Sequence, residues 1–303
     1  MHKLTILDGG MGRELQDIGA PFSQPLWSAQ ALIEAPEFVS QAHQNFVDAG
    51  AEIVIVNSYA CVPFHLGDAL YQSDGARLAT LAASIAHNVC MKATSSNRPI
   101  SVAGAIPPPF GSYRPDLFDA DKAKLIVASL VAAQQPYVDL WLAETISSIK
   151  EFEVIQTALS TTGKSCYYSF NLDDRVSNQA CLRSGESVSS AAKRVCQTGA
   201  KAILFNCSIP EVMEQAIKDA KQVIEAQDGD VEIGVYANNF MPIKTDHEAN
   251  SSLQPMRELS PDDYLVYAKR WYDAGASIIG GCCGIGPAHI NALSQWKCAL
   301  LDQ

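Results

Sequence analysis

Eight apolar runs recur along the chain, and a longer stretch in which apolar residues have helical spacing follows each of them. Each run has the length and the β-branched content of a buried strand. The predicted strands are residues 4–8, 52–57, 100–106, 138–144, 165–171, 202–207, 232–237 and 277–281. The predicted helices are residues 37–49, 78–93, 122–135, 150–159, 188–197, 211–226, 261–274 and 287–300.

This alternation predicts an α/β fold, a (β/α)8 TIM barrel that forms a single domain over residues 1–303. An open doubly wound sheet is the alternative, but no G-x-G-x-x-G turn follows any predicted strand, so the barrel is favoured. Three connections that follow strands are long: 59–74, 107–121 and 238–260. In a barrel, loops that follow strands lie at the face where active sites are built.

The charge balance excludes some classes of partner. Lys and Arg number 22 against 33 Asp and Glu, a net charge of −11, and no basic cluster stands out, which argues against nucleic acids and anionic membranes. The N-terminus enters a strand-like run at once, which predicts no signal peptide, and no apolar stretch approaches the ~20 residues of a membrane span. We therefore expect a cytoplasmic protein with small-molecule substrates. The sequence leaves open whether it forms a homo-oligomer.

Three of the nine cysteines lie where predicted strands end. Cys207 ends the sixth strand, and Cys282 and Cys283 end the eighth among glycines. Strand ends converge at one mouth of a barrel, so these thiols are predicted to meet although some 75 positions separate them. Three thiolates suit Zn²⁺ and leave one of its four positions open, which is typical of a catalytic site.

An open site with three thiolates favours alkyl transfer onto sulfur. A substrate thiol bound there loses its proton, and the anionic sulfurs keep it nucleophilic. The alternatives for the trio are buried packing residues, a vicinal disulfide, or a non-catalytic zinc-storage or thiol-sensing protein. Cys61, after the second strand, is either a packing residue or a spectator near the metal. His65 and His247 are predicted to lie on solvated loops.

Polar residues end other predicted strands. Glu144 closes an apolar run, where a carboxylate is costly unless it has a partner. Asp8 ends the first strand, with a role in capping the following turn as the alternative. We expect Asn206 to contribute to substrate binding, with hydrogen bonding to neighbouring loops as the alternative.

Three segments together resemble the homocysteine S-methyltransferase family over essentially the whole chain: DGGMGREL at 8–15, NC at 206–207 and GGCCG at 280–284. The resemblance implies a (β/α)8 barrel, homocysteine as the methyl acceptor, methionine as the product, and a zinc ion held by the three cysteines. It also implies that Asp8 and Glu144 hold the ammonium group of homocysteine. By the same resemblance, the backbone of Gly9 and Gly10 approaches the bound amino acid closely.

The methyl donor depends on the subgroup. Relatives use S-methylmethionine, S-adenosylmethionine, betaine or methyl-cobalamin, and the chain length favours a sulfonium donor over the last two. The segment PLWS at 25–28 resembles the sulfonium subgroup, which makes Trp27 a substrate-binding residue. Aromatic faces attract a cationic donor, and the aromatic residues near the mouth are Trp27, Tyr59, Phe110, Tyr113 and Phe240. Loops 106–114 and 238–260 depart from the family pattern, so a betaine-type enzyme or another thiol or selenol methyltransferase is the alternative.

Overall fold

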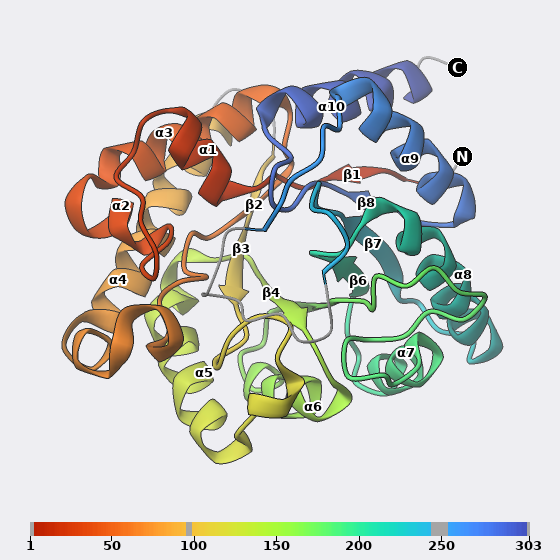
Figure 1. Ribbon diagram of the computed structural model, residues 1–303, viewed down its shortest axis with the longest axis horizontal. Coiled ribbons are helices and arrows are strands. Elements are labelled where there is room, and N and C mark those ends of the chain that lie inside the picture. Colours follow the sequence, from red (N-terminus) through yellow and green to blue (C-terminus); the bar gives the residue numbers. More distant parts are fainter. Residues whose placement is uncertain (1–2, 95–98, 244–253, 302–303) are drawn as a thin grey trace.

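The structure, a computed structural model, describes residues 3–94, 99–243 and 254–301. Within these residues, eight strands form one parallel sheet in the order β1-β8-β7-β6-β5-β4-β3-β2. A parallel bridge between Leu7 and Ile53 joins the two ends of that order and closes the sheet into a barrel (Figure 1). The predicted fold is confirmed. The strands are β1 (Thr5–Ile6), β2 (Ile53–Ile55), β3 (Ser101–Ile106), β4 (Leu140–Ile146), β5 (Ser165–Phe170), β6 (Ala202–Asn206), β7 (Glu232–Tyr236) and β8 (Ile278–Ile279).

Helices surround the barrel on the outside (Figure 1). All eight predicted helices are present, and most of their bounds agree to within a residue or two. The helices are α1 (Met11–Asp17), α2 (Ala29–Glu34), α3 (Pro36–Ala49), α4 (Pro63–Thr94), α5 (Ala120–Gln134), α6 (Ile149–Leu159), α7 (Val188–Cys196), α8 (Pro210–Ala226), α9 (Pro261–Ala274) and α10 (Pro287–Leu301), with short 3₁₀ turns at Pro115–Leu117 and Gln135–Tyr137.

The expectation of a loop over residues 59–74 was wrong, because α4 begins within it. Gly67 has φ 72° and ψ 156°, which is not helical, and it kinks α4 after one turn. Because of this break, the apolar residues of the first turn do not continue the helical spacing of the rest of α4, so the pattern does not indicate a helix there. The short helices α1 and α2 were also not predicted, since seven and six residues are too few to show a period.

Local signals explain where the long helices start and stop. The side chains of Ser148, Ser187 and Ser260 each accept a hydrogen bond from a backbone N–H in the first turn of α6, α7 and α9. At the other end, Gly50 and Gly275 follow α3 and α9 with φ of 114° and 126°, which lets the chain turn into the next strand.

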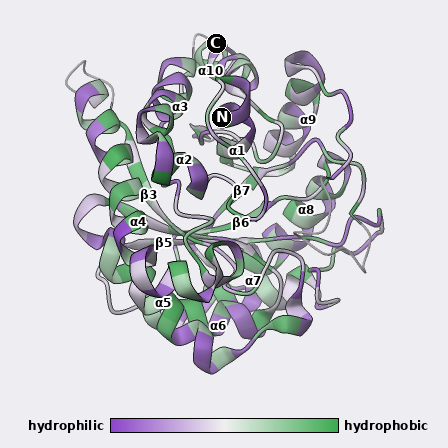
Figure 2. Ribbon diagram, turned by 60° about the vertical axis from the view of Figure 1, so that its left-hand side comes forward, coloured by the Kyte–Doolittle hydropathy of each residue, from purple (hydrophilic) through white to green (hydrophobic). Residues whose placement is uncertain are grey.

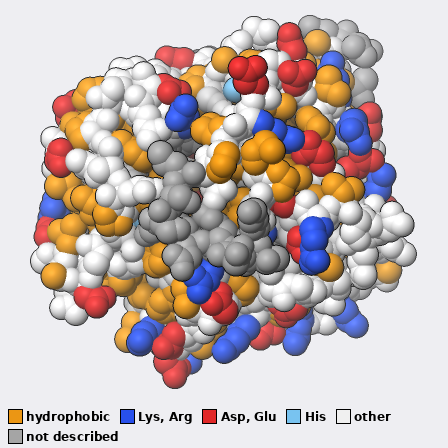
Figure 3. Space-filling model, in the orientation of Figure 1, with side chains coloured by type: hydrophobic (Ala, Val, Ile, Leu, Met, Phe, Trp, Pro, Cys, Tyr) orange, Lys and Arg blue, Asp and Glu red, His pale blue; other side chains and the backbone are white. Residues whose placement is uncertain are grey.

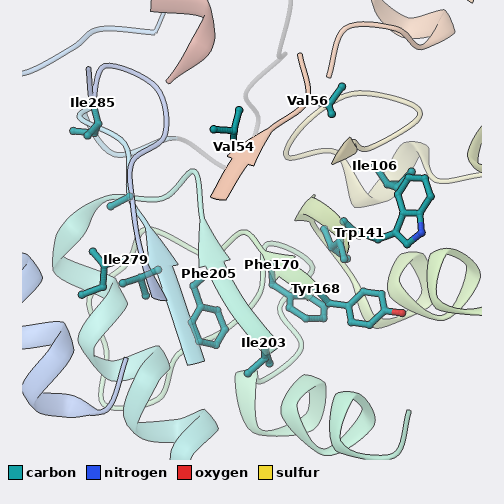
Figure 4. Packing of buried hydrophobic residues seen from close by; sticks show 14 of the residues in the cluster. Val54, Val56, Ile106, Trp141, Tyr168, Phe170, Ile203, Phe205, Ile279 and Ile285 are labelled. Atoms are coloured by element: carbon teal, nitrogen blue, oxygen red, sulfur yellow. The ribbon is translucent and has the colours of Figure 1, made fainter. Parts of the chain in front are cut away.

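Two apolar layers hold the barrel together. Along β4, Leu140 and Leu142 point into the barrel, whereas Trp141 and Ala143 point out toward the helices. Figure 4 shows the outer layer, in which side chains such as Phe205 pack between strands and helices. The helices have mixed hydrophobic and hydrophilic residues along their length, as amphipathic helices do (Figure 2).

The loops that follow the strands form the barrel mouth. After β7, the chain runs out through Phe240 and returns through Met256, and these two residues form an antiparallel bridge. Residues 244–253, including His247, lie outside the described residues. On the face shown in Figure 3, acidic and basic side chains are interspersed on the described part of the surface. In the described part of the chain, no helix combines the length and apolar character needed to cross a bilayer.

Candidate active site

Three cysteine side chains meet at the mouth of the barrel. The Sγ atoms of Cys207, Cys282 and Cys283 all lie within 4.8 Å of one another. Cys207 follows β6 and the Cys282–Cys283 pair follows β8, so the group lies on both sides of β7. Two backbone hydrogen bonds hold these segments to β7 and the residue after it: Cys207 N donates to Tyr236 O (3.3 Å), and Cys282 N donates to Ala237 O (2.9 Å). Sulfurs on a tetrahedral zinc with Zn–S of ~2.3 Å are ~3.8 Å apart. The spacing of the trio is compatible with that geometry.

The backbone near the cysteines leaves regular strand geometry, which is what lets adjacent thiols face one point. Gly284 has φ +80°, and a Cβ on it would overlap the side chain of Asn239. The turn is closed by Ile285 N donating to Cys282 O (3.0 Å), and Asn239 N donates to Cys283 O (3.1 Å). Cys207 itself has φ +50°, a left-handed conformation that is uncommon for a residue with a Cβ.

The three thiols share protons unequally. The pKa of Cys283 lies well below its ordinary value because Cys207 and Cys282 donate S–H bonds to it. The pKa of Cys282 is raised well above its ordinary value by its contacts with the other two sulfurs and by burial. A bound cation favours the ionised form of all three thiols. An all-sulfur donor set suits a soft or borderline metal such as zinc, and among the described residues no other Cys, His, Asp or Glu joins the group.

Two buried carboxylates lie near the trio. Asp8 is 2% exposed and Glu144 is 8% exposed. Asp8 Oδ2 accepts a hydrogen bond from Ile55 N on β2 (2.8 Å), and its buried Oδ1 has no partner among the described residues. This bond goes across to β2, and a role of Asp8 in the site remains a prediction.

Burial raises the pKa of both carboxyls well above their ordinary values. For Glu144, the nearby Cys207 and Asp8 raise the pKa further, because like charges would be brought together. Two such acids, with an unpartnered oxygen between barrel strands, form a site that a cation stabilises. An ammonium group is such a cation, and its three N–H donors can bond to carboxylate oxygens.

Gly9 and Gly10 pack against the loop that carries the cysteine pair. A Cβ on Gly10 would lie 2.5 Å from Cys282 O, and one on Gly9 would overlap Ile285 O. Gly10 N also donates to Ile285 O (2.9 Å). These glycines thus let the end of β1 touch the cysteine loop, which gives them a packing role. Their predicted close approach to a bound amino acid remains a prediction.

Asn206 is fully buried, and its side chain is bonded within the protein. Its Oδ1 accepts from Thr145 N (3.0 Å) and Ser169 Oγ (2.8 Å), and its Nδ2 donates to Thr145 Oγ1 (2.9 Å). The sequence did not indicate these partners. Substrate binding by Asn206 remains a prediction, and these bonds to Thr145 and Ser169 make it less favourable.

Aromatic side chains cluster between the loops after β1 and β2. The ring of His65 lies 6.3 Å from Trp27, 6.2 Å from Tyr59 and 5.1 Å from Phe64, measured between centroids. His65 was expected on the solvated surface, and this was wrong: it is 6% exposed, and its Nδ1 lies 3.2 Å from Pro25 O. Burial lowers the pKa of His65 to about 4, so the ring is neutral near pH 7.

Other mouth residues contact the cysteines directly. Tyr113, Phe240 and Ile243 belong to one apolar cluster with the trio, and the Tyr113 hydroxyl donates to Cys207 O (3.1 Å). Ile243 was not predicted, since nothing in its sequence context distinguishes it from a loop residue. Phe110 instead pairs with Phe118 at 6.2 Å between ring centroids.

Cys61 lies outside the group of three cysteines. It is fully buried in the main apolar cluster, and burial raises the pKa of its thiol to about 12. Its place in this cluster, away from the group of three sulfurs, favours the packing role over a place near the metal.

Comparison with known proteins agrees with this geometry. A family model described as homocysteine S-methyltransferase matches residues 5–296. The chain belongs to this family. It is a methyltransferase by that membership, and the match includes both carboxylates and all three cysteines of the mouth.

The relatives match from end to end. Homocysteine S-methyltransferase 3 from Arabidopsis thaliana is 28% identical, over 96% of this chain and 89% of the relative. A selenocysteine Se-methyltransferase from Brassica oleracea var. italica is 27% identical, over 96% and 88%. Among solved structures, the metallated form of the homocysteine methyltransferase MmuM from Escherichia coli superposes with a TM-score of 0.80 at 24% identity, over 97% of this chain and 96% of that one. This last match shows a shared fold.

Proposed function

We propose that the chain moves a methyl group from a sulfonium donor, S-methylmethionine or S-adenosylmethionine, to the thiolate of homocysteine, giving methionine. The observation that carries the proposal is the meeting of three Sγ atoms within 4.8 Å, beside two buried carboxyl groups whose pKa values burial raises. Residues 1–303 would form one homocysteine-binding domain. A cytoplasmic location agrees with this use of the thiols, because the cytosol keeps thiols reduced.

Cys207, Cys282 and Cys283 would hold Zn²⁺ as thiolates. When bound, the ion would stabilise a substrate sulfur in its thiolate form at neutral pH. The protein's own contribution is to bring the three sulfurs together from β6 and β8 and to leave the fourth position without a protein ligand among the described residues.

Asp8 and Glu144 would bind the ammonium group of homocysteine. The raised pKa of each carboxyl indicates an unfavourable buried charge, which a bound ammonium offsets. With the amino group held there, the substrate sulfur lies toward the cysteines. The thiolate then attacks the donor's methyl carbon, a new S–C bond forms as the old one breaks, and the donor leaves as a neutral thioether. The attack itself needs no general base, so positioning of the two substrates supplies much of the rate.

The aromatic cluster would bind the donor. Trp27 and Tyr59 offer ring faces that attract a sulfonium cation. His65 between them is neutral, since burial lowers its pKa to about 4, so it does not repel a positive donor.

Replacing each of Cys207, Cys282 and Cys283 with serine tests the metal site. Bound zinc, measured by elemental analysis, should fall well below one ion per chain, and methionine formation should fall by about a hundredfold or more because one of the ion's three protein ligands is lost. Cys61→Ala is the matched control, since it removes a buried thiol outside the trio and should keep both properties. A trio variant with one zinc per chain and wild-type turnover would refute the proposal.

A substrate panel tests the reaction. Homocysteine is offered with S-methylmethionine, S-adenosylmethionine and betaine in parallel, and methionine is quantified. Selenocysteine serves as a second acceptor, because one relative is named a selenocysteine Se-methyltransferase. Zinc binding with no methyl transfer from any donor would favour the zinc-storage or thiol-sensing alternative.

A further inference from the structure

Two residues adjoin the key side chains of the proposed site. Asn206 directly precedes Cys207, and Thr145 directly follows Glu144. Their strands, β6 and β4, are not neighbours, because β5 lies between them in the sheet. Backbone pairing relates the two strands only through β5, and the register of β4 on β5 shifts between Ala143 and Ile146, next to Glu144.

One side-chain amide spans this gap. Asn206 Oδ1 accepts from Thr145 N at 3.0 Å, and Asn206 Nδ2 donates to Thr145 Oγ1 at 2.9 Å. The Asn206 side chain lies across β5, where Ser169 Oγ donates to the same Oδ1 at 2.8 Å. All three residues are fully buried, so water does not compete for these bonds.

The residues on either side of this link have unusual backbone conformations. Thr145 has φ +60° and Cys207 has φ +50°, and the pairing of β4 with β5 shifts register between Ala143 and Ile146. A left-handed conformation is unfavourable for a residue with a Cβ, above all for β-branched threonine, and it persists only where surrounding bonds impose it. The Thr145 N–H and hydroxyl are both held by Asn206.

We propose that Asn206 is a positioning residue that fixes Glu144 relative to Cys207. The inference rests on the proposed function, in which homocysteine reaches from the ammonium site at Glu144 to the metal site at Cys207. Loss of the hydrogen bonds between Asn206 and Thr145 would shift both Glu144 and Cys207, which bind the two ends of homocysteine in that proposal. Direct contact with substrate is disfavoured, because Asn206 is fully buried and its Oδ1 already accepts two hydrogen bonds.

Asn206→Ala in the zinc-loaded enzyme is the main test. It should raise the homocysteine KM about tenfold, as loss of two buried hydrogen bonds to Thr145 would. It should also weaken zinc retention in competition with a chelator, since the segment before Cys207 is released. Gln134→Ala is the matched control: it removes another fully buried amide, one that joins α5 to Ala105, and should lower the melting temperature without changing either quantity.

A double-mutant cycle separates positioning from contact. In a Glu144→Gln background, Asn206→Ala should raise the homocysteine KM little further, because the carboxylate that it positions is gone. Zinc retention should still fall. Additive effects on KM would mean that Asn206 contacts the substrate independently, and would overturn the proposal. So would an unchanged KM and unchanged zinc retention in Asn206→Ala.

Thr145 supplies a milder pair of variants in case Asn206→Ala does not fold. Thr145→Ser keeps the hydroxyl that Asn206 binds and should behave like wild type. Thr145→Val removes that hydroxyl, together with its contact to Tyr59, and should shift the homocysteine KM in the same direction as Asn206→Ala. Equal KM values for the two would refute the link. Failure of the proposed function is distinguishable, because wild type would then make no methionine at all.

Discussion

Glu144→Gln tests the buried carboxylate pair, and it should weaken homocysteine binding while stabilising the protein. The substitution keeps the shape of the side chain and removes its charge. Losing one charge of a buried hydrogen-bonded ion pair costs about 2–5 kcal/mol. Because Asp8 remains to hold the ammonium group, we expect the lower end of this range, about 2 kcal/mol, which raises the homocysteine dissociation constant roughly thirtyfold.

The effect on stability has the opposite sign. Burial raises the pKa of Glu144 well above its ordinary value, so the folded protein binds its proton more tightly than the unfolded chain does. In wild type, the stability that this proton contributes is complete below the unfolded pKa of about 4.3 and is lost as pH rises through the folded pKa. Glutamine has no such loss. The variant's melting temperature should therefore exceed that of wild type at pH 8 by more than at pH 5.

Glu151→Gln is the matched control. Glu151 is also a buried glutamate, with its pKa raised to about 7 by burial, but it accepts its hydrogen bond from Ser147 N at the start of α6. It should show a similar gain in stability at high pH and no change in homocysteine affinity. The assays are titration calorimetry with homocysteine and thermal unfolding at both pH values, with equal zinc loading. Unchanged affinity in Glu144→Gln would remove Glu144 from the ammonium site, and an unchanged melting temperature at pH 8 would contradict the reasoning from burial.

Two further substitutions test the packing of the site. Gly10→Ala should destabilise the protein by about 1–3 kcal/mol and weaken zinc binding, because its Cβ would lie 2.5 Å from Cys282 O. Gly12→Ala is the control: Gly12 lies in α1, its Cβ would lie 3.5 Å from the Phe22 ring, and the change should be neutral or stabilising. Equal effects of the two substitutions in thermal unfolding and in chelator competition would contradict this reasoning. His65→Phe should reduce the stability lost on acidification, because the pKa of His65 is lowered to about 4 and the folded state loses stability as pH falls from about 6.5 toward 4. The difference in unfolding free energy between variant and wild type should change by about 2 kcal/mol between pH 7.5 and pH 5. A difference that stays constant with pH would contradict this expectation.

The barrel could be predicted because buried parallel strands are nearly continuous apolar runs and long helices have clear ends. Thus α9 was found between Pro261 and Ala274, as the structure has it. Helix α2 was missed, since six residues do not establish a period. The start of α4 was missed because Gly67 interrupts the spacing.

The site was predictable as far as strand ends determine it. Cys207, Cys282 and Cys283 come together because the ends of β6 and β8 share one mouth. The link between Asn206 and Thr145 could not be foreseen, since it depends on a left-handed threonine, and a threonine in sequence predicts ordinary strand geometry. The burial of His65 likewise depends on tertiary packing, between the first turn of α4 and the segment that carries Trp27.

The order of synthesis gives the cysteine group one more property. A ribosome releases Cys207 some 75 residues before Cys282, and the two segments meet only when β8 has docked between β7 and β1. A nascent chain therefore lacks the full set of thiols until its last strand is in place. Binding of a metal ion by all three thiols must therefore follow the docking of β8, and it reports that the ring of strands has closed.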